Sequence, residues 1–239
     1  MANNTCTRID MKFTSTFLPA VYVLVFIIGF FANCFGLKSV FKSWKNLGNI
    51  NFFVLNLGVA DLLYVFTLPF LVVYYASNSK WTFGQPFCKT WPNTSYACFD
   101  TTSDHLMKTY LPYSIVWTFT GFGVPLLIIL GCYGHVAVVL TSKANVNTLL
   151  KQRCLKLVVM LIVLFSVCFI PYHVLRNLNL KTRIMKREGT CYESFDDIYI
   201  AYQVSRGLAC MNSAINPLIY LVGNDDFLLR FHEISKRAR

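Results

Sequence analysis

The stretch YQVSRGLACMNSAINPLIY, residues 202–220, is apolar enough to lie in a membrane, yet it carries one arginine, Arg206. An arginine at the centre of a membrane helix costs about 2.5–3.5 kcal/mol on insertion scales. That cost is tolerable when the guanidinium faces protein or a water-filled cavity rather than lipid. Residues 202–220 therefore predict a membrane helix with one polar, inward-facing side.

The composition of the whole chain indicates the same class. Of its 239 residues, 55% are hydrophobic and only 14% are charged, and short charged runs separate long apolar ones. Continuous apolar runs are typical of spanning helices, whereas the strands of a membrane barrel alternate in polarity. We predict an all-α membrane protein with an N-terminal tail at 1–16 and helices at about 17–41, 52–76, 110–142, 154–179 and 198–222.

The placement of lysine and arginine favours an N-terminus outside the cell and a C-terminus inside. Basic residues outnumber acids in the segments that are then cytoplasmic, between the first and second and the third and fourth predicted helices and after the last. This bias accounts for the net charge of +11 without a nucleic-acid partner. Because residues 1–16 are polar, we expect no cleavable signal and a first helix that inserts itself.

Possible modification sites agree with this orientation. Glycosylation sequons begin at Asn3 and Asn93, and both fall outside, although such short motifs often arise by chance. The cysteines that fall on the same side, where disulfides can form, are Cys6, Cys88, Cys98 and Cys191.

Polar residues inside the predicted helices need partners, because lipid offers none. These residues are Asn33, Asp61, Asn212, Ser213 and Asn216. One interpretation is a shared cluster at mid-membrane, which would suit a small cation. The alternative is that each helix satisfies its own polar group.

Prolines also lie in or at the ends of the predicted helices, at Pro69, Pro125, Pro171 and Pro217. Each frees a backbone carbonyl and favours a kink. Kinked helices around a polar centre are compatible with a bundle that changes shape. Membrane helices also simply tolerate proline, and the residues alone do not separate the two interpretations.

The surroundings of Arg206 suggest a ligand site near the outer side. Tyr199, Tyr202, Gln203 and Arg206 share one helical face, since they stand at i, i+3, i+4 and i+7. His173 and Arg176 share a face of the preceding helix, and Asp100 could approach from the loop above. Arginine binds phosphate or carboxylate through its planar fork, and tyrosine can stack on an aromatic ring. The alternative is that Arg206 pairs with Asp100 and Arg176 reaches the surface.

At this level of detail the motifs resemble a known family. GFFANC (29–34), LNLGVADLLYVFTLP (55–69), FIPYH (169–173) and NSAINPLIY (212–220) resemble the helix signatures of rhodopsin-like G-protein-coupled receptors. KWTFGQPFCK (80–89), CFDTTSD (98–104), YHVLRNLNL (172–180) and AYQVSRGLACMNSAINP (201–217) resemble the purinergic nucleotide receptors, ADP-responsive type.

The resemblance implies roles for particular residues, a plasma-membrane location, an extracellular nucleotide such as ADP as ligand and a heterotrimeric G protein as partner. The implied nucleotide site is His173, Arg176, Tyr199, Tyr202, Gln203 and Arg206, with Asp100 pairing with Arg206 when it is empty. The implied polar network, linked to a sodium ion near Asp61, is Asn33, Asp61, Asn212, Ser213 and Asn216. The implied switch residues are Pro125, Tyr133, Phe165, Phe169, Pro171, Pro217 and Tyr220. The implied disulfides are Cys6–Cys191 and Cys88–Cys98.

The chain also departs from the resembled family, whose members have seven helices. Cys88-Lys89 runs at once into Trp91-Pro92-Asn93, so the third and fourth helices are missing. No Arg-Tyr pair preceded by an acid or histidine occurs, so the family's coupling arginine is absent. We expect a five-helix remnant that keeps its topology, because an even number of helices is lost, but that signals weakly or not at all. Splicing, an incomplete gene model and engineering would all give this sequence.

The C-terminal segment, residues 225–239, has Phe227, Phe231 and Ile234 on one helical face with basic residues around it. It is predicted to be an amphipathic helix on the inner leaflet of the bilayer. A disordered tail is the alternative.

Three function classes follow from these observations. The first is a nucleotide receptor at the plasma membrane, impaired in signalling. The second is a non-signalling fragment, in part retained in the endoplasmic reticulum, that pairs with full-length receptors as a receptor dimer and alters their trafficking. An enzyme or transporter is not indicated, because no metal-ligand cluster, nucleophile–base pair, phosphate loop or inverted repeat is found in the sequence.

Overall fold

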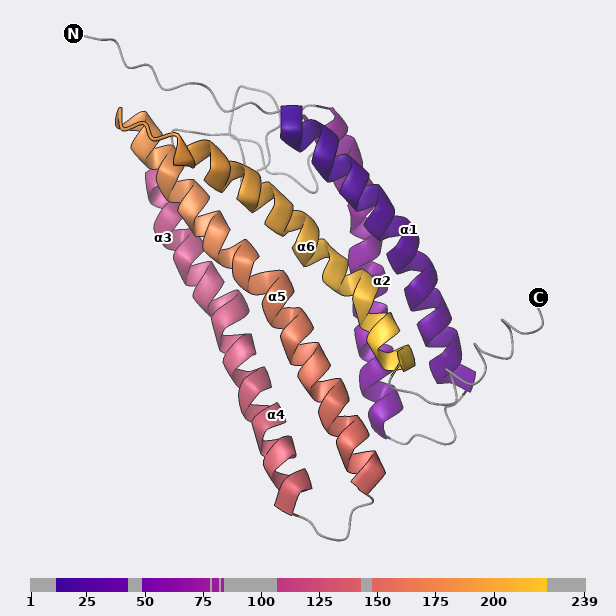
Figure 1. Cartoon of the computed structure of the whole chain (residues 1–239). Helices are drawn as coiled ribbons and strands as arrows, with labels where there is room; N and C mark the ends of the chain where they lie inside the picture. Colours follow the sequence, from indigo (N-terminus) through magenta and orange to yellow (C-terminus); the bar gives the residue numbers. More distant parts are fainter. Residues whose placement is uncertain are drawn as a thin grey trace. The chain divides into compact units, whose positions relative to one another are not determined.

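The computed structural model describes residues 12–42, 49–77, 79–81, 83, 107–142 and 148–222. This part of the chain is all-helical, which confirms the predicted fold class (Figure 1). The elements are α1 (Lys12–Lys42), α2 (Asn49–Ala76), α3 (Met107–Thr118), η3 (Phe119–Gly123), α4 (Val124–Ser142), α5 (Thr148–Arg187) and α6 (Ser194–Val222). Because α3, η3 and α4 follow one another without a break, the described chain forms five rods.

Four of the described helical stretches are long and apolar enough to cross a membrane: Lys12–Phe41, Leu55–Ala76, Tyr110–Cys132 and Val159–Arg187. α6 is less apolar, since Arg206 and several amide and hydroxyl side chains lie within it. The helices also run further than the predicted ranges, most of all α5, which continues to Arg187 rather than ending near 179. Its last turns carry basic residues, which a helix tolerates once it has left the hydrocarbon.

A π-helical turn precedes Pro125 in the third rod. In η3 the backbone N–H of Val124 donates to the carbonyl oxygen of Phe119, five residues earlier. Such a turn holds one extra residue and rotates the helix that follows it. Pro69, Pro171 and Pro217 lie inside α2, α5 and α6, and none of them ends its helix.

α5 ends in a Schellman motif at Gly189. The backbone N–H of Thr190 donates to the Met185 carbonyl over 3.0 Å, and that of Gly189 donates to the Lys186 carbonyl over 3.2 Å. Gly189 has a φ of 86°, a left-handed conformation that glycine adopts without steric cost. α6 then begins at Ser194, and acids in its first turn favour the positive end of the helix dipole.

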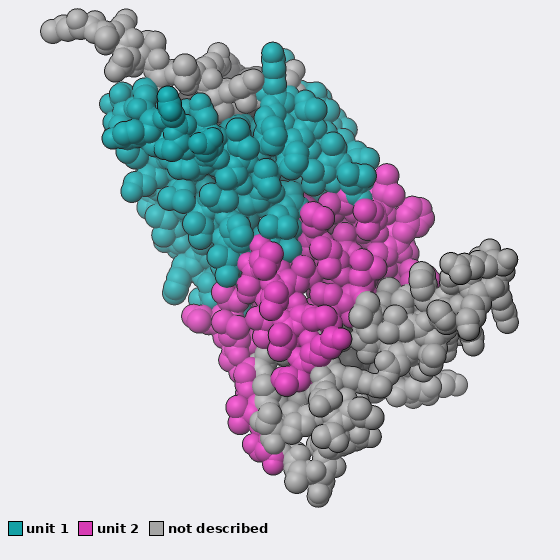
Figure 2. Space-filling model, viewed as in Figure 1, with its two compact units in different colours: residues 1–24, 67–125, 168–209 teal, residues 25–66, 126–167, 210–239 magenta. Residues whose placement is uncertain are grey.

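Two compact units make up the chain (Figure 2). Unit 1 contains residues 1–24, 67–125 and 168–209, and unit 2 contains residues 25–66, 126–167 and 210–239. The core of unit 1 is rich in buried tyrosines, among them Tyr22, Tyr75 and Tyr202. Each rod therefore contributes residues to both units.

The helices of unit 2 approach one another closely at Gly29 of α1. A Cβ atom at this position would lie 2.9 Å from Val65 Cγ2 on α2 and 3.5 Å from the Ala214 Cβ on α6. Only glycine fits such an approach without a shift of its neighbours. Small residues thus set the helix spacing in this unit. The predicted amphipathic segment at 225–239 and both sequons lie outside the described residues.

Candidate ligand site

Arg206 lies on α6 among tyrosines. Its Nη2 atom donates a hydrogen bond to the Tyr75 hydroxyl on α2, and its Nη1 atom donates to Gln203 Oε1 over 3.4 Å. The guanidinium carbon lies 4.9 Å from the centre of the Tyr75 ring and 5.6 Å from that of Tyr202. Two ring faces and a hydroxyl therefore offset much of the cost of this charge in the membrane.

Arg176 on α5 has a similar environment. Its Nη2 atom donates to the Tyr110 hydroxyl on α3 over 2.6 Å, and its guanidinium carbon lies 6.0 Å from the centre of the same ring. One turn earlier, the His173 ring stacks on Phe122 of η3 with a centroid separation of 4.5 Å. Arg176 and Arg206 are thus each held by a tyrosine from another helix.

A path of aromatic rings links α5 to α6 and leads to Arg206. Tyr172 meets His173 edge-on at 5.0 Å and stacks on Tyr202 at 6.1 Å. Tyr202 in turn lies against Arg206. The ring path, in order, comprises Phe122, His173, Tyr172, Tyr202, Arg206 and Tyr75. The two predicted faces, one on α5 and one on α6, therefore meet in unit 1.

The remaining predicted residues of the α6 face are buried. Gln203 is 3% exposed, and Tyr199 shares a hydrogen bond with the Thr14 hydroxyl at the start of α1. Tyr199 is thus directed toward α1, while Tyr202 is directed toward α5. Contacts connect His173, Tyr202, Gln203 and Arg206 into one set, whereas Arg176 lies one turn after His173 on α5 and contacts Tyr110. Asp100 lies outside the described residues.

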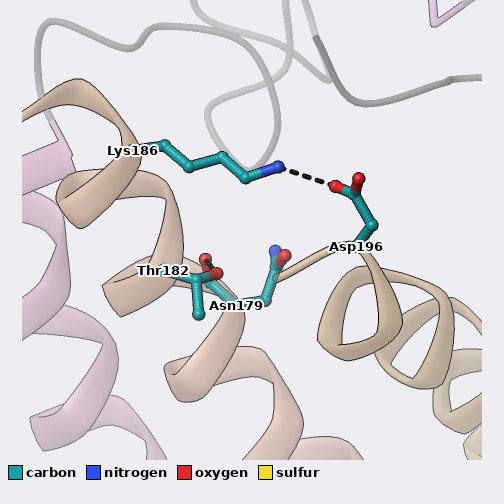
Figure 3. Close-up of polar contacts among 4 residues, drawn as sticks. All are labelled: Asn179, Thr182, Lys186 and Asp196. Atoms are coloured by element: carbon teal, nitrogen blue, oxygen red, sulfur yellow. Dashed lines mark hydrogen bonds and ion pairs between the residues drawn. The ribbon is translucent and has the colours of Figure 1, made fainter. Parts of the chain in front are cut away.

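An ion pair joins the outer ends of α5 and α6. Lys186 Nζ lies 2.6 Å from Asp196 Oδ1, and the lysine side chain is only 14% exposed (Figure 3). Figure 3 also shows Asn179 and Thr182, which lie one to two turns before Lys186 on α5, where the Thr182 hydroxyl donates to the Asn179 carbonyl over 2.9 Å. Both side chains are buried. An ion pair therefore joins α5 and α6 at this end, next to buried polar side chains of α5.

The predicted polar network lies in unit 2. Asn216 Nδ2 donates to both carboxylate oxygens of Asp61, over 3.1 and 3.3 Å. Asn33 Nδ2 donates to the Ser213 carbonyl over 2.9 Å, and the Ser213 side chain is a further hydrogen-bonding neighbour of Asp61. α1, α2 and α6 thus share one chain of hydrogen bonds here. Asn212 is half-buried beside it.

Comparison with known families identifies the class of protein. The family model described as "7 transmembrane receptor (rhodopsin family)" matches residues 32–103 and 92–220. The chain belongs to this family. It is therefore a class A G-protein-coupled receptor with several membrane passes, and not an enzyme.

Curated relatives resemble this receptor over most of its length. Purinoceptor 1 of Homo sapiens is 30% identical over 301 residues, which cover 98% of this chain and 81% of the relative. The Rattus norvegicus protein of the same name is 29% identical with the same coverage. The 2-oxoglutarate receptor 1 of Rattus norvegicus is 28% identical over 296 residues, 95% of this chain and 86% of the relative. The receptor thus belongs to the purinergic group.

The family match also bears on the missing helices. It falls into two segments that overlap at residues 92–103, directly after the Cys88-Lys89 junction. The alignment with the human relative runs over 301 residues, more than the 239 of this receptor, so the relative carries residues that this receptor lacks. Both findings agree with the predicted loss of the third and fourth helices.

The predicted switch residues are distributed over three rods. Pro125 directly follows the π turn, Phe165, Phe169 and Pro171 lie on α5, and Pro217 lies on α6. Tyr133 and Tyr220 lie within α4 and α6, and their side chains are outside the described part of the structure. Their role in switching stays a prediction.

The predicted disulfides involve mostly residues that the structure does not describe. Cys191, in the turn between α5 and α6, is disulfide-bonded. Its predicted partner Cys6, and the predicted pair Cys88 and Cys98, lie outside the described residues. The pairing therefore stays a prediction.

Sequence reasoning missed the residues that hold the arginines. Tyr75 and Tyr110 are neutral and sit near helix ends, where tyrosine is common in membrane proteins, so nothing in the sequence marks them. Asn177 and Asn179 stood inside the quoted YHVLRNLNL motif but were given no role. Two asparagines among apolar residues of a membrane helix were the available signal, because such amides need partners.

Proposed function

We propose that this receptor binds an extracellular nucleotide, with ADP as the expected ligand, and that its coupling to a heterotrimeric G protein is impaired. The observation that carries the proposal is the pair Arg176 and Arg206 in unit 1, each of which donates to a tyrosine hydroxyl. A ring path also leads from His173, one turn before Arg176, to Arg206. The planar guanidinium of arginine can bind phosphate through two hydrogen bonds, and the aromatic rings offer stacking surfaces for a nucleotide base. The names of the purinoceptor relatives support the same ligand class.

Two buried polar atoms on α5 add support. His173 Nδ1 and Asn179 Oδ1 are buried and have no hydrogen-bond partner among the described residues. Buried polar atoms are nearly always paired in native proteins, so an atom with unused capacity indicates a place for a ligand or water. His173 lies on the ring path, and Asn179 lies about one turn beyond Arg176.

The proposed impairment follows from the missing helices. The sequence contains no Arg-Tyr pair preceded by an acid or histidine, and the third helix, which would carry it, is absent. We therefore expect no agonist-evoked calcium release from this chain in cells that lack other nucleotide receptors. A calcium response to ADP would contradict the proposed impairment.

The ligand test uses two forms of the receptor. The first is the chain itself, and the second carries the third and fourth helices of human purinoceptor 1 inserted after Lys89. Radiolabelled ADP should bind the second form tightly and the first form more weakly. 2-Oxoglutarate, which has two anionic ends, serves as the competing probe because another relative is named for it. Binding of 2-oxoglutarate in place of ADP would overturn the proposed ligand class.

One observation favours a second function, pairing with full-length receptors. No residue is buried in the most apolar 18-residue window of Tyr110–Cys132, and only 6% of that window is buried in Val159–Arg187, against 22% in Lys12–Phe41 and 28% in Leu55–Ala76. The most apolar parts of the first two spans therefore leave surface that lipid or another membrane protein can cover. Co-expression with full-length purinoceptor 1, followed by surface biotinylation, tests this. Reduced surface levels and co-purification from the endoplasmic reticulum support pairing, whereas unchanged surface levels without co-purification exclude it.

We also propose that a sodium ion binds near Asp61. Hard cations prefer oxygen ligands, and Asp61 supplies a carboxylate while Ser213 supplies a hydroxyl beside it. Asn33 Oδ1, which is buried and has no hydrogen-bond partner among the described residues, is a third candidate. Bound sodium would neutralise the carboxylate charge inside the bilayer, and this would stabilise unit 2.

A further inference from the structure

Four side chains at four-residue intervals line one side of the third rod. The Tyr110 hydroxyl accepts from Arg176, the Ser114 hydroxyl donates to Asn177 Oδ1 over 2.9 Å, and Asn177 Nδ2 donates to Thr118 Oγ1 over 3.0 Å. Phe122 completes the series through its stack on His173. Residues spaced by four lie on one helical face, so a single face of this rod contacts α5.

Asn177 is the centre of this contact. Its oxygen accepts from Ser114, and its nitrogen donates both to Thr118 and to the His173 carbonyl of its own helix, 3.0 Å away. Ser114 is fully buried, although the most apolar part of the Tyr110–Cys132 span is otherwise open to the surroundings. Both the oxygen and the nitrogen of the Asn177 side chain therefore have hydrogen-bond partners, although most residues of the neighbouring span are not buried.

All the hydrogen bonds of the Asn177 side chain can form in only one register of α5 against α3. Ser114 and Thr118 lie one turn apart and bracket the amide, so a slide of one turn, about 5.4 Å, removes one of its two hydroxyl partners. The apolar side chains of the two helices do not discriminate between registers in this way, because lipid solvates them equally well. A single buried asparagine fixes register in coiled coils by the same principle.

We infer that Asn177 is a positioning residue, which fixes α3 against α5 and thereby holds Arg176 at Tyr110 and His173 against Phe122. Arg176 directly precedes Asn177, so any slide of α5 along α3 also moves its guanidinium away from the Tyr110 hydroxyl. The inference on register stands on the contacts alone. Its consequence for ligand binding rests on the proposed function.

The register is measured by electron–electron distance spectroscopy on the full chain in lipid nanodiscs. Spin labels are attached to keto-bearing unnatural residues at Val116 and Val174, which are 61% and 52% exposed, so all nine cysteines stay in place. The unsubstituted chain should give one narrow distance distribution. Asn177→Leu should broaden it or shift it by about 5 Å, the length of one helical turn.

Milder variants keep the test valid if Asn177→Leu fails to fold. Ser114→Ala and Thr118→Val each leave the amide one of its hydroxyl partners, and each should broaden the distribution less than Asn177→Leu does. Thr120→Val is the matched control, because the Thr120 hydroxyl donates to the Val116 carbonyl of its own helix. If Ser114→Ala and Thr118→Val both give the distribution of the Thr120→Val control, the inference is wrong.

Binding of ADP to the form with restored helices provides the second readout. If Asn177 acts by positioning Arg176, then Arg176→Ala should weaken ADP binding far less in the Asn177→Leu background than in the unsubstituted receptor. Equal fold-losses in both backgrounds would show that Asn177 does not act through Arg176. Failure of ADP to bind any form would reject the proposed ligand, while the distance measurement would still decide the register.

Discussion

Replacing Tyr75 with phenylalanine separates the two ways in which this tyrosine holds Arg206. The substitution removes the hydroxyl that accepts from Arg206 Nη2 and leaves the ring, whose centre lies 4.9 Å from the guanidinium carbon. Tyr75 is 3% exposed, so water cannot readily replace the lost hydroxyl. The expected result is a less stable unit 1 that keeps the cation–π contact.

The magnitude follows from the kind of contact that is lost. A hydrogen bond to a charged group contributes about 1.5–3 kcal/mol to stability. For a chain of this size each kcal/mol lowers the melting temperature by about 2–4 °C. Tyr75→Phe should therefore lower the melting temperature by about 3–12 °C. Tyr75→Ala removes the ring as well, and aromatic-to-alanine changes in a core reach about 3–5 kcal/mol.

Buried thiols supply the assay. Cys168 and Cys210 are not disulfide-bonded and are only 1% and 5% exposed, so a thiol-reactive dye reports unfolding as it gains access to them. Exposed Cys34 and Cys132 give a background that does not depend on unfolding. Tyr113→Phe is the matched control, because Tyr113 is 56% exposed and its ring packs on Tyr110 and Trp117 rather than on Arg206.

A double-mutant cycle with Arg206→Met then isolates the contact. Tyr75→Phe should have little further effect once Arg206 has been removed, because the hydroxyl no longer has a charge to bind. Strictly additive effects of the two substitutions would refute the reasoning, as would a melting temperature of Tyr75→Phe equal to that of the Tyr113→Phe control.

Four further predictions concern the site and the topology. In the form with restored helices, Arg206→Ala should weaken ADP binding by about ten- to a hundredfold. Arg206→Lys should restore only part of the lost affinity, since lysine lacks the planar guanidinium that binds phosphate through two N–H groups. A poorly folded variant with normal ADP binding would mark the arginine as structural. An epitope tag at the C-terminus should be detectable only after permeabilisation, and detection on intact cells would reverse the proposed orientation. Non-reducing peptide mapping should recover Cys6 linked to Cys191, and a free thiol at Cys6 would exclude that pair. Sodium should raise the melting temperature more than potassium does, and Asp61→Asn should abolish the difference; an equal effect of both ions on the unsubstituted chain would argue against the sodium site.

Sequence patterns predicted the helices well because the bilayer imposes a simple rule. Long uncharged runs must be helical where no water can satisfy the backbone, and this places α1 to α6 without knowledge of any contact. The ends were harder to predict. α5 runs to Arg187 because its basic last turns and the Gly189 cap continue a helix beyond the hydrocarbon, where hydropathy carries no information.

The candidate site was only partly predictable. Charge in an apolar helix drew attention to Arg176 and Arg206, and helical spacing added their neighbours. The partners Tyr75 and Tyr110 come from other helices, 131 and 66 residues away along the chain from the arginine that each one holds. Periodicity describes one helix at a time, so it cannot show which tyrosine of another helix meets a given arginine.

The division of every rod between two units has a consequence for biosynthesis. Thr14 and Tyr199, which bond within unit 1, are separated by 185 residues, and Asp61 and Asn216, which bond within unit 2, by 155. Neither unit can form these hydrogen bonds while the ribosome is still making α6, although the earlier helices can already be inserted into the membrane one by one. Until the last helix is released, their polar side chains need other partners, and membrane-embedded chaperones that shield such groups would act in this interval.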